Sequence, residues 1–330
     1  MQYFSVPGCS KSLSSMALGT QDFTLKGKEQ WFRLMDEYVK QGGCIIDTAR
    51  MYGNFEAEKV IGEWLRLNPE MLSRVFIVTK GCLFDTTSSL KSKGWSGKPL
   101  SRAQILNDLE ESLKDLDIPK VDAFLLHRDA ENAPIPELFD TLHELRLEQK
   151  IDCYGVSNWT QDRTRQANEY CKSKGYAPIA INSPAFSVPH VTESQYAGCL
   201  HATPEYIKWN VDQGIIPLCW APNATGFMSG RITKTETGKI QTDMSLDGAF
   251  KRTYFSPTNW LRLAVARRMA EEKKASVSQI ALRFVMSFSG QVPVIPILGC
   301  HRIETLDDCV KAMDGVLTKE EQEALLVEEK

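Results

Sequence analysis

Four polar residues in the first part of the chain have the types and spacing of an acid–base site. Asp47 follows an apolar run, and Tyr52 lies five positions later in "DTARMYGN". Lys80 ends the run "VFIVTK", and His127 ends "VDAFLLH". Tyrosine, with a pKa of ~10, is a poor acid or base at neutral pH, and a nearby ammonium group lowers that pKa. We therefore predict that Asp47 holds Lys80, and that Lys80 tunes Tyr52 for proton exchange with a substrate oxygen.

Each of these residues also has an ordinary structural explanation. Asp47 can cap a turn, and Tyr52 can be a half-buried ring. Lys80 can be a solvated charge, and His127 can be a structural histidine. Their joint placement at the ends of successive apolar runs favours a reaction centre, in which His127 would orient a carbonyl oxygen or share its proton. None of the four side chains is a reductant, so such a site needs a cofactor.

Eight short apolar runs recur along the chain, each with the length of a buried parallel strand. They are residues 15–20, 44–48, 75–80, 121–127, 153–158, 179–182, 215–220 and 292–298. Between them lie stretches in which apolar residues repeat with helical period. Strands that alternate with helices indicate a parallel sheet, and eight such units form an α/β protein of the closed (β/α)8 TIM barrel type. An open dinucleotide-binding sheet usually carries G-x-G-x-x-G after its first strand, which this sequence lacks.

Barrel enzymes keep their active sites at the carboxyl ends of the strands. The acid, the lysine and the histidine end three successive predicted strands, so we expect them to meet at one rim. Residues 81–100 and 221–258 also follow strands, and we expect both to form large loops on the C-terminal face. Pro293 and Pro296 conflict with an interior strand, but the flanking helices favour that assignment. We interpret 1–330 as a single barrel domain.

The composition is that of an ordinary globular protein. The chain has 330 residues, 42% hydrophobic and 25% charged, with a net charge of −3. The absence of a basic block argues against nucleic acid, and no apolar run is long enough to span a membrane. No secretory signal is evident, and nine cysteines without C-x-x-C spacing suggest free thiols in the cytoplasm. Cys300 lies beside a possible ligand site, so we expect it to be prone to oxidation.

Five motifs together resemble the successive signatures of the aldo-keto reductase family. They are "DTARMYGNFEAEKVIG", "VTKG", "LLHRD", "GVSN" and "IPILGC". The resemblance implies a (β/α)8 barrel with a nicotinamide cofactor, usually NADPH, across its top. It also implies a catalytic tetrad of Asp47, Tyr52, Lys80 and His127. In such an enzyme a hydride passes from nicotinamide C4 to a carbonyl carbon, and Tyr52 protonates the oxygen.

The same resemblance implies residues that hold the nicotinamide. Ser157 and Asn158 of "GVSN" match the pair that hydrogen-bonds its carboxamide, and a polar turn before a helix is the alternative. Trp220 matches an aromatic residue that stacks on the nicotinamide ring, and a core tryptophan is the alternative. Ser183 stands where many members carry glutamine, so one hydrogen bond to the carboxamide is in doubt.

At the other end of the cofactor, the segment "IPILGCHR" resembles one that contacts the adenosine 2′-phosphate. It contains Gly299, His301 and Arg302, of which Arg302 carries the guanidinium group that suits phosphate. An exposed position in the first turn of a helix is the alternative for Arg302. Thr305 and Cys309 replace residues that often touch the adenine end, so cofactor binding there is expected to be unusual.

Two other classes of function remain as alternatives. One is a non-catalytic nicotinamide-binding regulatory subunit on the same fold, although no extension looks suited to dock a partner. The other is a metal-dependent hydrolase, but the five histidines show no H-x-H or H-E-x-x-H spacing. Candidates to line a substrate pocket are Phe84, Trp95, Trp159 and Phe227. They suggest an apolar or aromatic carbonyl substrate, although each can equally pack a loop against the barrel.

Overall fold

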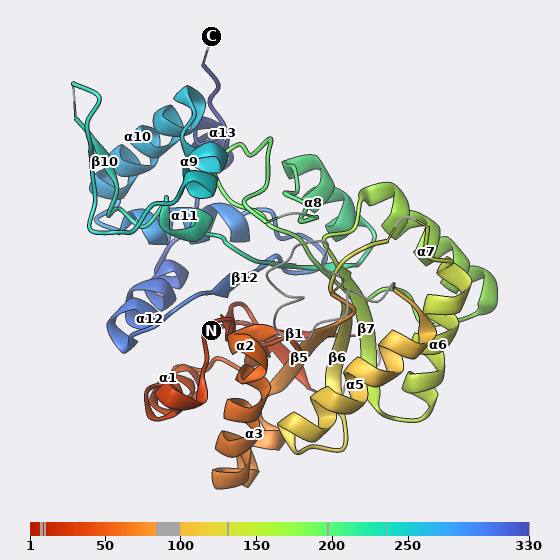
Figure 1. Cartoon of the computed structure of the whole chain (residues 1–330). Helices are drawn as coiled ribbons and strands as arrows, with labels where there is room; N and C mark the ends of the chain where they lie inside the picture. The colour runs from red at the N-terminus through yellow and green to blue at the C-terminus, as the bar shows by residue number, and fades with distance from the viewer. Residues whose placement is uncertain are drawn as a thin grey trace.

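Eight parallel strands close into a barrel around which the rest of the chain is arranged (Figure 1). The structure is a computed structural model that describes residues 1–330 except 7, 8, 10, 84–99, 131, 197, 236 and 330. The barrel strands are β3 (Ala17–Gly19), β4 (Ile45–Asp47), β5 (Phe76–Gly81), β6 (Val121–Leu126), β7 (Ile151–Ser157), β8 (Ile181–Ser183), β9 (Ile216–Cys219) and β12 (Ile295–Leu298). Closure is made by β12, which pairs with β9 on one side and β3 on the other. The predicted (β/α)8 barrel is therefore confirmed, with all eight expected strands.

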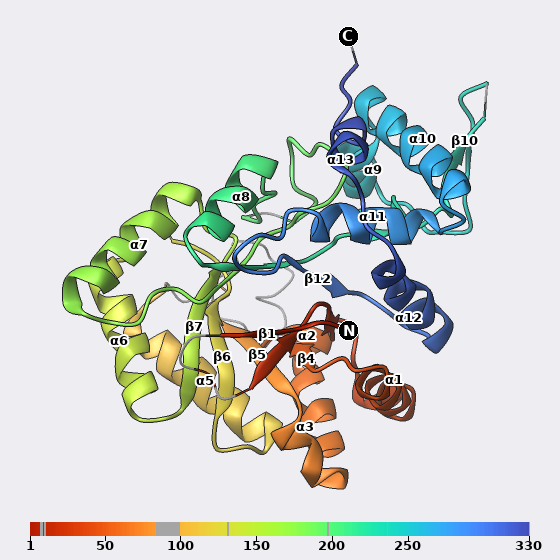
Figure 2. The ribbon, with the colours of Figure 1, turned by 180° about the vertical axis from the view of Figure 1, so that it is seen from behind.

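Helices lie outside the barrel strands and cover them (Figures 1 and 2). Those between the strands are α1 (Lys28–Lys40), α2 (Tyr52–Phe55), α3 (Ala57–Leu67), α5 (Arg102–Leu116), α6 (Ile135–Leu147), α7 (Gln161–Lys174), α8 (Pro204–Asp212), α10 (Pro257–Glu272) and α11 (Val277–Met286). After β12 come α12 (Ile303–Val310) and α13 (Lys319–Ala324). Short 3-10 helices occupy Leu25–Gly27, Pro69–Ser73 and Lys311–Asp314. Several helices start at a Ser or Thr whose side chain accepts a backbone N–H, as Ser101 does from Gln104.

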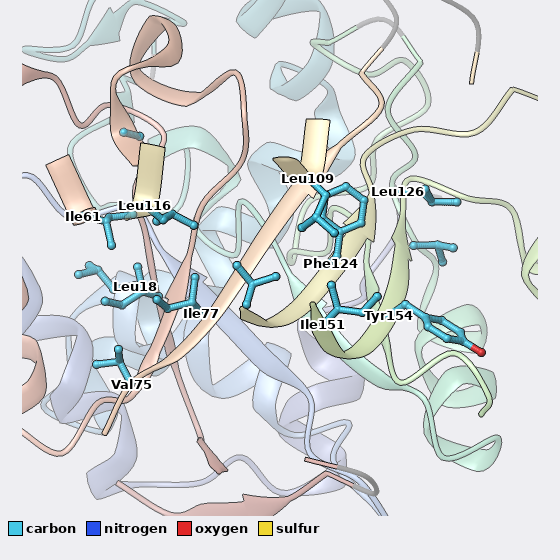
Figure 3. Packing of buried hydrophobic residues seen from close by; sticks show 14 of the residues in the cluster. Leu18, Ile61, Val75, Ile77, Leu109, Leu116, Phe124, Leu126, Ile151 and Tyr154 are labelled. Carbon is cyan, nitrogen blue, oxygen red and sulfur yellow. The ribbon is translucent and has the colours of Figure 1, made fainter. Parts of the chain in front are cut away.

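Alternation along each strand separates the helix-facing core from the barrel interior. In β5, Ile77 packs in the cluster between strands and helices, whereas Phe76 and Val78 belong to the interior cluster. Figure 3 shows Leu18, Ile77 and Phe124 of three strands among residues such as Ile61 and Leu109 of the covering helices. Because side chains alternate with period two, Lys80 follows Val78 into the interior at the carboxyl end of β5.

The amino-terminal end of the barrel is closed by the start of the chain. An antiparallel hairpin, β1 (Tyr3–Ser5) with β2 (Ser12–Ser14), lies there. Between its strands Lys11 reaches the barrel, with Nζ 2.9 Å from Asp122 Oδ1 and donating to the carbonyl of Val75 at 2.8 Å. Asp122 also accepts the backbone N–H of Ile77 at 2.8 Å. With this end covered, the carboxyl ends of the strands are the face available for chemistry.

The segment 221–258 is not the bare loop that its length and glycines predict. It contains a 3-10 helix at Ala224–Gly226, a hairpin of β10 (Thr233–Lys234) and β11 (Ile240–Gln241), and helix α9 (Gly248–Tyr254). These elements gather with α10 and α13 on one side of the barrel (Figures 1 and 2). Phe227 is 0% exposed and stacks on Tyr254, so it fills a second core and does not line a pocket. The prediction failed because this packing involves distant segments.

Three further expectations concern the loops and the last strand. The expected loop 81–100, with Phe84 and Trp95, lies largely outside the described residues, which exclude 84–99. Pro293 precedes β12, and Pro296 lies inside it, where Ile295 and Pro296 pair with β9 while Ile297 and Leu298 pair with β3. Such short ladders accommodate one residue without an N–H. Among the helices described, none is long and apolar enough to cross a membrane.

Gly155 of β7 tests how tightly the barrel is packed. A Cβ there would lie 2.1 Å from the Ile181 carbonyl oxygen and 2.6 Å from Leu125 Cδ2. Gly155→Ala is therefore expected to destabilise the fold by at least the ~1–3 kcal/mol of ordinary overpacking, measured by urea unfolding. Gly248→Ala is the matched control, because its nearest neighbour is the flexible end of Arg252 at 3.4 Å. Equal midpoints for both variants would contradict the expectation.

Candidate active site

A buried ion pair lies at the centre of the carboxyl rim. Lys80 Nζ donates to Asp47 Oδ1 at 2.6 Å, to the Thr48 carbonyl at 3.1 Å and to the Tyr52 hydroxyl at 3.4 Å. Asp47 and Lys80 are each 2% exposed. An ammonium group has three N–H donors and no acceptor, so these three oxygens satisfy it. The hydroxyl hydrogen of Tyr52 is then available to a ligand, because its oxygen is the acceptor toward Lys80.

His127 completes the group that the sequence predicts. Its ring stands edge-on to Tyr52, with centroids 5.7 Å apart and an interplanar angle of 79°. Its Nδ1 is buried and finds no hydrogen-bond partner among the described residues. The four predicted catalytic side chains therefore come together from β4, the first residue of α2 at the end of the loop after β4, β5 and the residue after β6.

The charges of the ion pair support each other against burial. Burial raises the pKa of the Asp47 carboxyl, and the Lys80 ammonium opposes that rise. Burial also disfavours the ammonium, but attraction from Asp47 and Tyr52 outweighs it and leaves the pKa of Lys80 above its ordinary value. Lys80 therefore stays charged at neutral pH beside the phenol.

The two other groups are neutral near pH 7. Burial raises the pKa of the Tyr52 phenol, and the Lys80 ammonium acts in the opposite direction without cancelling the effect. Burial, Lys80 and Arg128 hold the pKa of His127 well below its usual range. A neutral phenol and a neutral imidazole can each donate a hydrogen bond to a carbonyl oxygen, and the phenol can give up its proton. Lys80 thus moves the pKa of Tyr52 downward as predicted, while the net shift in this structure is upward.

A left-handed turn presents Tyr52 to the lysine. Gly53, Asn54 and Phe55 have φ of 58°, 56° and 70°. The N–H of Gly53 donates to the Gln21 carbonyl at 2.8 Å, and a Cβ on Gly53 would lie 1.7 Å from the Phe23 carbonyl oxygen. Position 53 therefore requires glycine, both for its conformation and for this close approach. This turn was not predicted from the sequence, although the residues "GN" after the tyrosine are of the types that allow it.

The residues expected to hold the carboxamide form one hydrogen-bonded group. Ser157 Oγ donates to the Ser183 carbonyl at 2.7 Å, and Asn158 Nδ2 donates to Ser157 Oγ at 3.0 Å and to the His127 carbonyl at 3.2 Å. Asn158 Oδ1 accepts the Leu200 N–H at 3.2 Å. Ser183 Oγ is buried without a partner among the described residues. This orphaned hydroxyl lies one strand from Asn158 and can serve a polar ligand.

Aromatic residues border the same region. Trp220 is half-buried and follows β9. Its ring lies edge-on to that of His201, with centroids 5.7 Å apart, and the centroid of the Tyr196 ring is 6.2 Å from that of Trp220. His201 Nε2 is buried with no hydrogen-bond partner in the described part of the chain, and burial lowers the pKa of His201 to about 4. The sequence interpretation missed His201, which belongs to no motif. Its position depends on the path of the loop after β8.

Trp159 corrects another expectation. It was predicted to line a substrate pocket because it follows β7 at the active face. Its side chain is 0% exposed and packs edge-on against Phe139 of α6, with Arg163 of α7 over its ring. The tryptophan therefore fixes two helices to the barrel. Sequence position gives its depth along the strand but not the side to which it points.

The residues expected at the phosphate end lie beyond β12. Gly299, His301 and Arg302 are exposed, and Arg302 is the N-cap residue immediately before α12. His301 Nε2 lies 2.9 Å from Asp22 Oδ2, and its hydrogen bond to Asp22 raises the pKa of His301. Nothing lies within 4 Å of a Cβ built on Gly299, so the backbone there is open to a ligand.

Cys300, between these exposed residues, is not the reactive thiol that its position suggests. It is buried, and a hydrogen bond with Cys309 together with burial raises its pKa well above the usual range. Since the thiolate is the reactive form, this environment makes Cys300 inert. The expectation of easy oxidation was wrong because the side chain turns into the core below α12.

Comparison with known proteins identifies the family. The model of the Aldo/keto reductase family matches residues 15–326. The chain belongs to the aldo/keto reductase family. It is 25% identical to an aryl-alcohol dehydrogenase [NADP(+)] of Phanerodontia chrysosporium, over 97% of this chain and 83% of that protein. It is 24% identical to the uncharacterized oxidoreductase YrpG of Bacillus subtilis, over 97% of this chain and 93% of that protein.

A solved structure agrees with the fold. The crystal structure of a thermostable aldo-keto reductase, Tm1743, in complex with the inhibitor epalrestat has a TM-score of 0.70 to this chain. The two are 22% identical and cover 99% of each other. At this identity the likeness shows the shared (β/α)8 fold. Aldo-keto reductases are oxidoreductases that use nicotinamide cofactors, so the residues here must fit that group.

The site of this aldo-keto reductase fits a nicotinamide on physical grounds. Ser183 Oγ is a buried hydroxyl without a partner among the described residues, which is the kind of group that a carboxamide satisfies. Trp220 is half-buried, so part of its ring is open for stacking. Both lie at the same carboxyl rim as Tyr52. Elsewhere, the described residues contain no cluster of three or more His, Cys, Asp or Glu side chains suited to a metal ion.

Tyr52→Phe tests the predicted proton donor of this aldo-keto reductase. The variant keeps the ring and removes the hydroxyl, so turnover of a carbonyl substrate is expected to fall by ~10²–10⁴. Cofactor affinity should barely change, because the ring does not need its hydroxyl to pack. Lys80→Met should lose a similar factor, and the double variant should be little worse than either, since groups that act as one unit are non-additive.

Steady-state rates and a separate measurement of cofactor binding check this expectation. Tyr170→Phe is the control, because that half-buried tyrosine on α7 donates to Asp140 away from the barrel rim. A Tyr52→Phe protein that keeps most of its activity would show that the tyrosine has a structural role.

Proposed function

We propose that the chain, acting as one domain over 1–330, is an NADPH-dependent reductase of aldehydes or ketones. The observation that carries the proposal is the Lys80 ammonium held between the Asp47 carboxylate at 2.6 Å and the Tyr52 hydroxyl at 3.4 Å. This arrangement leaves a phenol proton free beside a fixed positive charge, at a rim with a neutral histidine. Such a site suits the protonation of an oxygen that becomes an alcohol.

In the proposed reaction Tyr52 donates its proton to the carbonyl oxygen. The Lys80 ammonium stabilises the phenolate that remains, and Asp47 keeps Lys80 charged and in place. His127, neutral because burial and Lys80 lower its pKa, donates a hydrogen bond that orients the carbonyl oxygen. When bound, the nicotinamide cofactor supplies the hydride for the carbonyl carbon. The same residues would act in reverse during alcohol oxidation.

The proposed cofactor-binding residues follow the rim. Ser157, Asn158 and Ser183 would hold the carboxamide, supported by the unpartnered hydroxyl of Ser183. Trp220 would pack against the nicotinamide ring. Asn158 already donates to the His127 carbonyl, so the same side chain would link cofactor and substrate groups.

NADPH is proposed over NADH because of the groups after β12. Arg302 carries an exposed guanidinium, and His301 gains positive charge readily because Asp22 raises its pKa. The open backbone at Gly299 allows a phosphate to approach. The name of the Phanerodontia chrysosporium relative includes NADP(+), which supports the same choice here.

Aromatic carbonyl compounds are the proposed substrate class. The rings of Tyr196, His201 and Trp220 lie together at the rim. Relatives called aryl-alcohol dehydrogenases, including a probable one of Saccharomyces cerevisiae that is 27% identical, support this class. That yeast match covers 90% of this chain and 87% of the relative.

A screen of aromatic aldehydes, aliphatic aldehydes, ketones and sugars, followed by NADPH absorbance, tests the reaction and its substrate class together. We expect aromatic aldehydes to give the highest kcat/KM. Cofactor binding without turnover of any carbonyl compound would instead favour the alternative, a non-catalytic nicotinamide-binding regulatory subunit. Faster turnover of sugars or short aliphatic aldehydes would remove the aromatic assignment and leave the reaction class intact.

NADPH preference is tested through Arg302→Ala. Losing a charge-assisted bond to the 2′-phosphate costs ~1.5–3 kcal/mol, or roughly 10- to 100-fold in NADPH affinity. NADH affinity should not change, because that cofactor has no 2′-phosphate. Fluorescence titration with both cofactors measures this, and Arg165→Ala, an exposed arginine on α7, is the control. Wild-type protein that binds NADH as tightly as NADPH would refute the preference.

A further inference from the structure

A buried carboxyl group lies behind the candidate active site and has no part in the proposed reaction. Glu58, on α3, is 1% exposed. Its Oε1 accepts a hydrogen bond from Thr79 Oγ1 at 2.5 Å, and its Oε2 lies 3.7 Å from Arg50 Nη1 without a hydrogen bond among the described residues. Burying a carboxyl group costs free energy, so the role of a buried glutamate must be sought in the two groups that it contacts.

One partner belongs to the strand that carries the lysine. Thr79 precedes Lys80 in β5, and alternation turns Thr79 outward toward α3 while Lys80 points into the barrel. The hydrogen bond from Thr79 to Glu58 therefore fixes this end of β5 against α3. A shift of Thr79 would move Lys80 by the same backbone displacement.

The other partner belongs to the loop that carries the tyrosine. Arg50 lies two residues before Tyr52, and its backbone N–H donates to the Lys80 carbonyl at 2.9 Å. From α5, Asp115 lies 2.8 Å and Glu111 3.4 Å from its guanidinium. Arg50 thus ties the loop to β5 through its backbone and to two helices through its side chain.

We propose that Glu58 is a positioning residue, which holds the loop bearing Tyr52 against the strand bearing Lys80 through Arg50 and Thr79. This inference rests on the proposed function, because it concerns the geometry of the same proton donor. The distance at stake is the 3.4 Å between Lys80 Nζ and the Tyr52 hydroxyl. That distance sets how strongly the ammonium stabilises the phenolate.

The surroundings of Glu58 make this role sensitive to pH. The groups that face it are Arg50 from the loop, Thr79 from β5, and Ser112 and Asp115 from α5. Burial raises the pKa of Glu58 from its ordinary 4.5 to about 7, against the hydrogen bond from Thr79. Below that value the neutral carboxyl no longer attracts Arg50, so the rate of reduction should rise with pH through neutrality.

Stability should change in the opposite direction. A carboxyl whose folded pKa is raised favours folding when protonated, so its contribution to stability falls as pH rises from about 4.5 to about 7. The ionisation of Glu58 therefore adds no folded protein as pH rises, and a rate that rises through neutrality cannot reflect a stability gain from this group. The two profiles separate positioning from unfolding.

Glu58→Gln is the main test, because it keeps an acceptor for Thr79 and removes the charge. The single-turnover rate of aldehyde reduction with NADPH is expected to fall roughly tenfold, since small displacements of reacting groups cost this order of rate. NADPH affinity should stay unchanged, and the rise through neutral pH should disappear. Glu111→Gln is the matched control, since Glu111 contacts the same guanidinium from a half-exposed position and should leave rate and pH profile near wild type.

A second readout does not need a substrate. The pKa of Tyr52, followed as tyrosinate absorbance by difference from Tyr52→Phe, should rise in Glu58→Gln because the loop bearing Tyr52 moves away from Lys80. Should wild type reduce no carbonyl compound, the proposed function fails, while this titration still judges Glu58.

A Glu58→Gln protein whose rate, pH profile and Tyr52 titration all match those of wild type would overturn the proposal. If that variant does not fold, Thr79→Val takes its place, since it removes the donor to Glu58 without burying a new polar group. Thr79→Val is expected to raise the pKa of Tyr52 and slow reduction in the same way. A wild-type titration and rate in Thr79→Val would likewise overturn the proposal.

Discussion

The buried pair of Asp47 and Lys80 is the interaction on which the site depends. Removing two charges from water costs several kcal/mol for each ion, so the pair persists only with short, complete hydrogen bonding. Here the ammonium reaches three oxygens, of which the Tyr52 hydroxyl is the most distant. The Asp47 carboxylate and the Thr48 carbonyl hold two N–H groups of the lysine. The third N–H donates to the hydroxyl oxygen of Tyr52. Because the phenol oxygen accepts at Lys80, its own proton is directed elsewhere.

The barrel provides this geometry through register and alternation. Asp47 pairs with Val78 of β5, and Lys80 pairs with Leu125 of β6, so successive strands bring their ends to one level. Alternation then turns both charged side chains inward, where the neighbouring interior positions are apolar. The covering helices add the second requirement, since the strand and the loop beside it are anchored on α3 and α5. The end of a strand determines roughly where a side chain lies, and the helices packed behind the strand fix that side chain more closely.

Local features of the sequence predict the strands and the polar residues at their ends, because each such feature depends on a few residues close together in the chain. Each strand is a short apolar run, and Asp47 and Lys80 are polar residues that end such runs. Packing between segments could not be predicted in this way. Trp159 looks like a loop aromatic, yet α6 and α7 bury it, and Cys300 stands between exposed residues while its thiol turns inward below α12. Glu58 looks like an exposed residue of "EAEK", and only the return of β5 and α5 buries it.

Burial and the same ammonium together keep the histidine neutral. The Asp47 carboxylate already balances the Lys80 ammonium. A protonated His127 would therefore be a second buried cation without a carboxylate of its own. His127 is therefore a neutral donor, and Tyr52 is the group with a proton to lose. Burial keeps both groups neutral, and Lys80 lowers the pKa of each, so a change that moved Lys80 would alter the histidine and the tyrosine together.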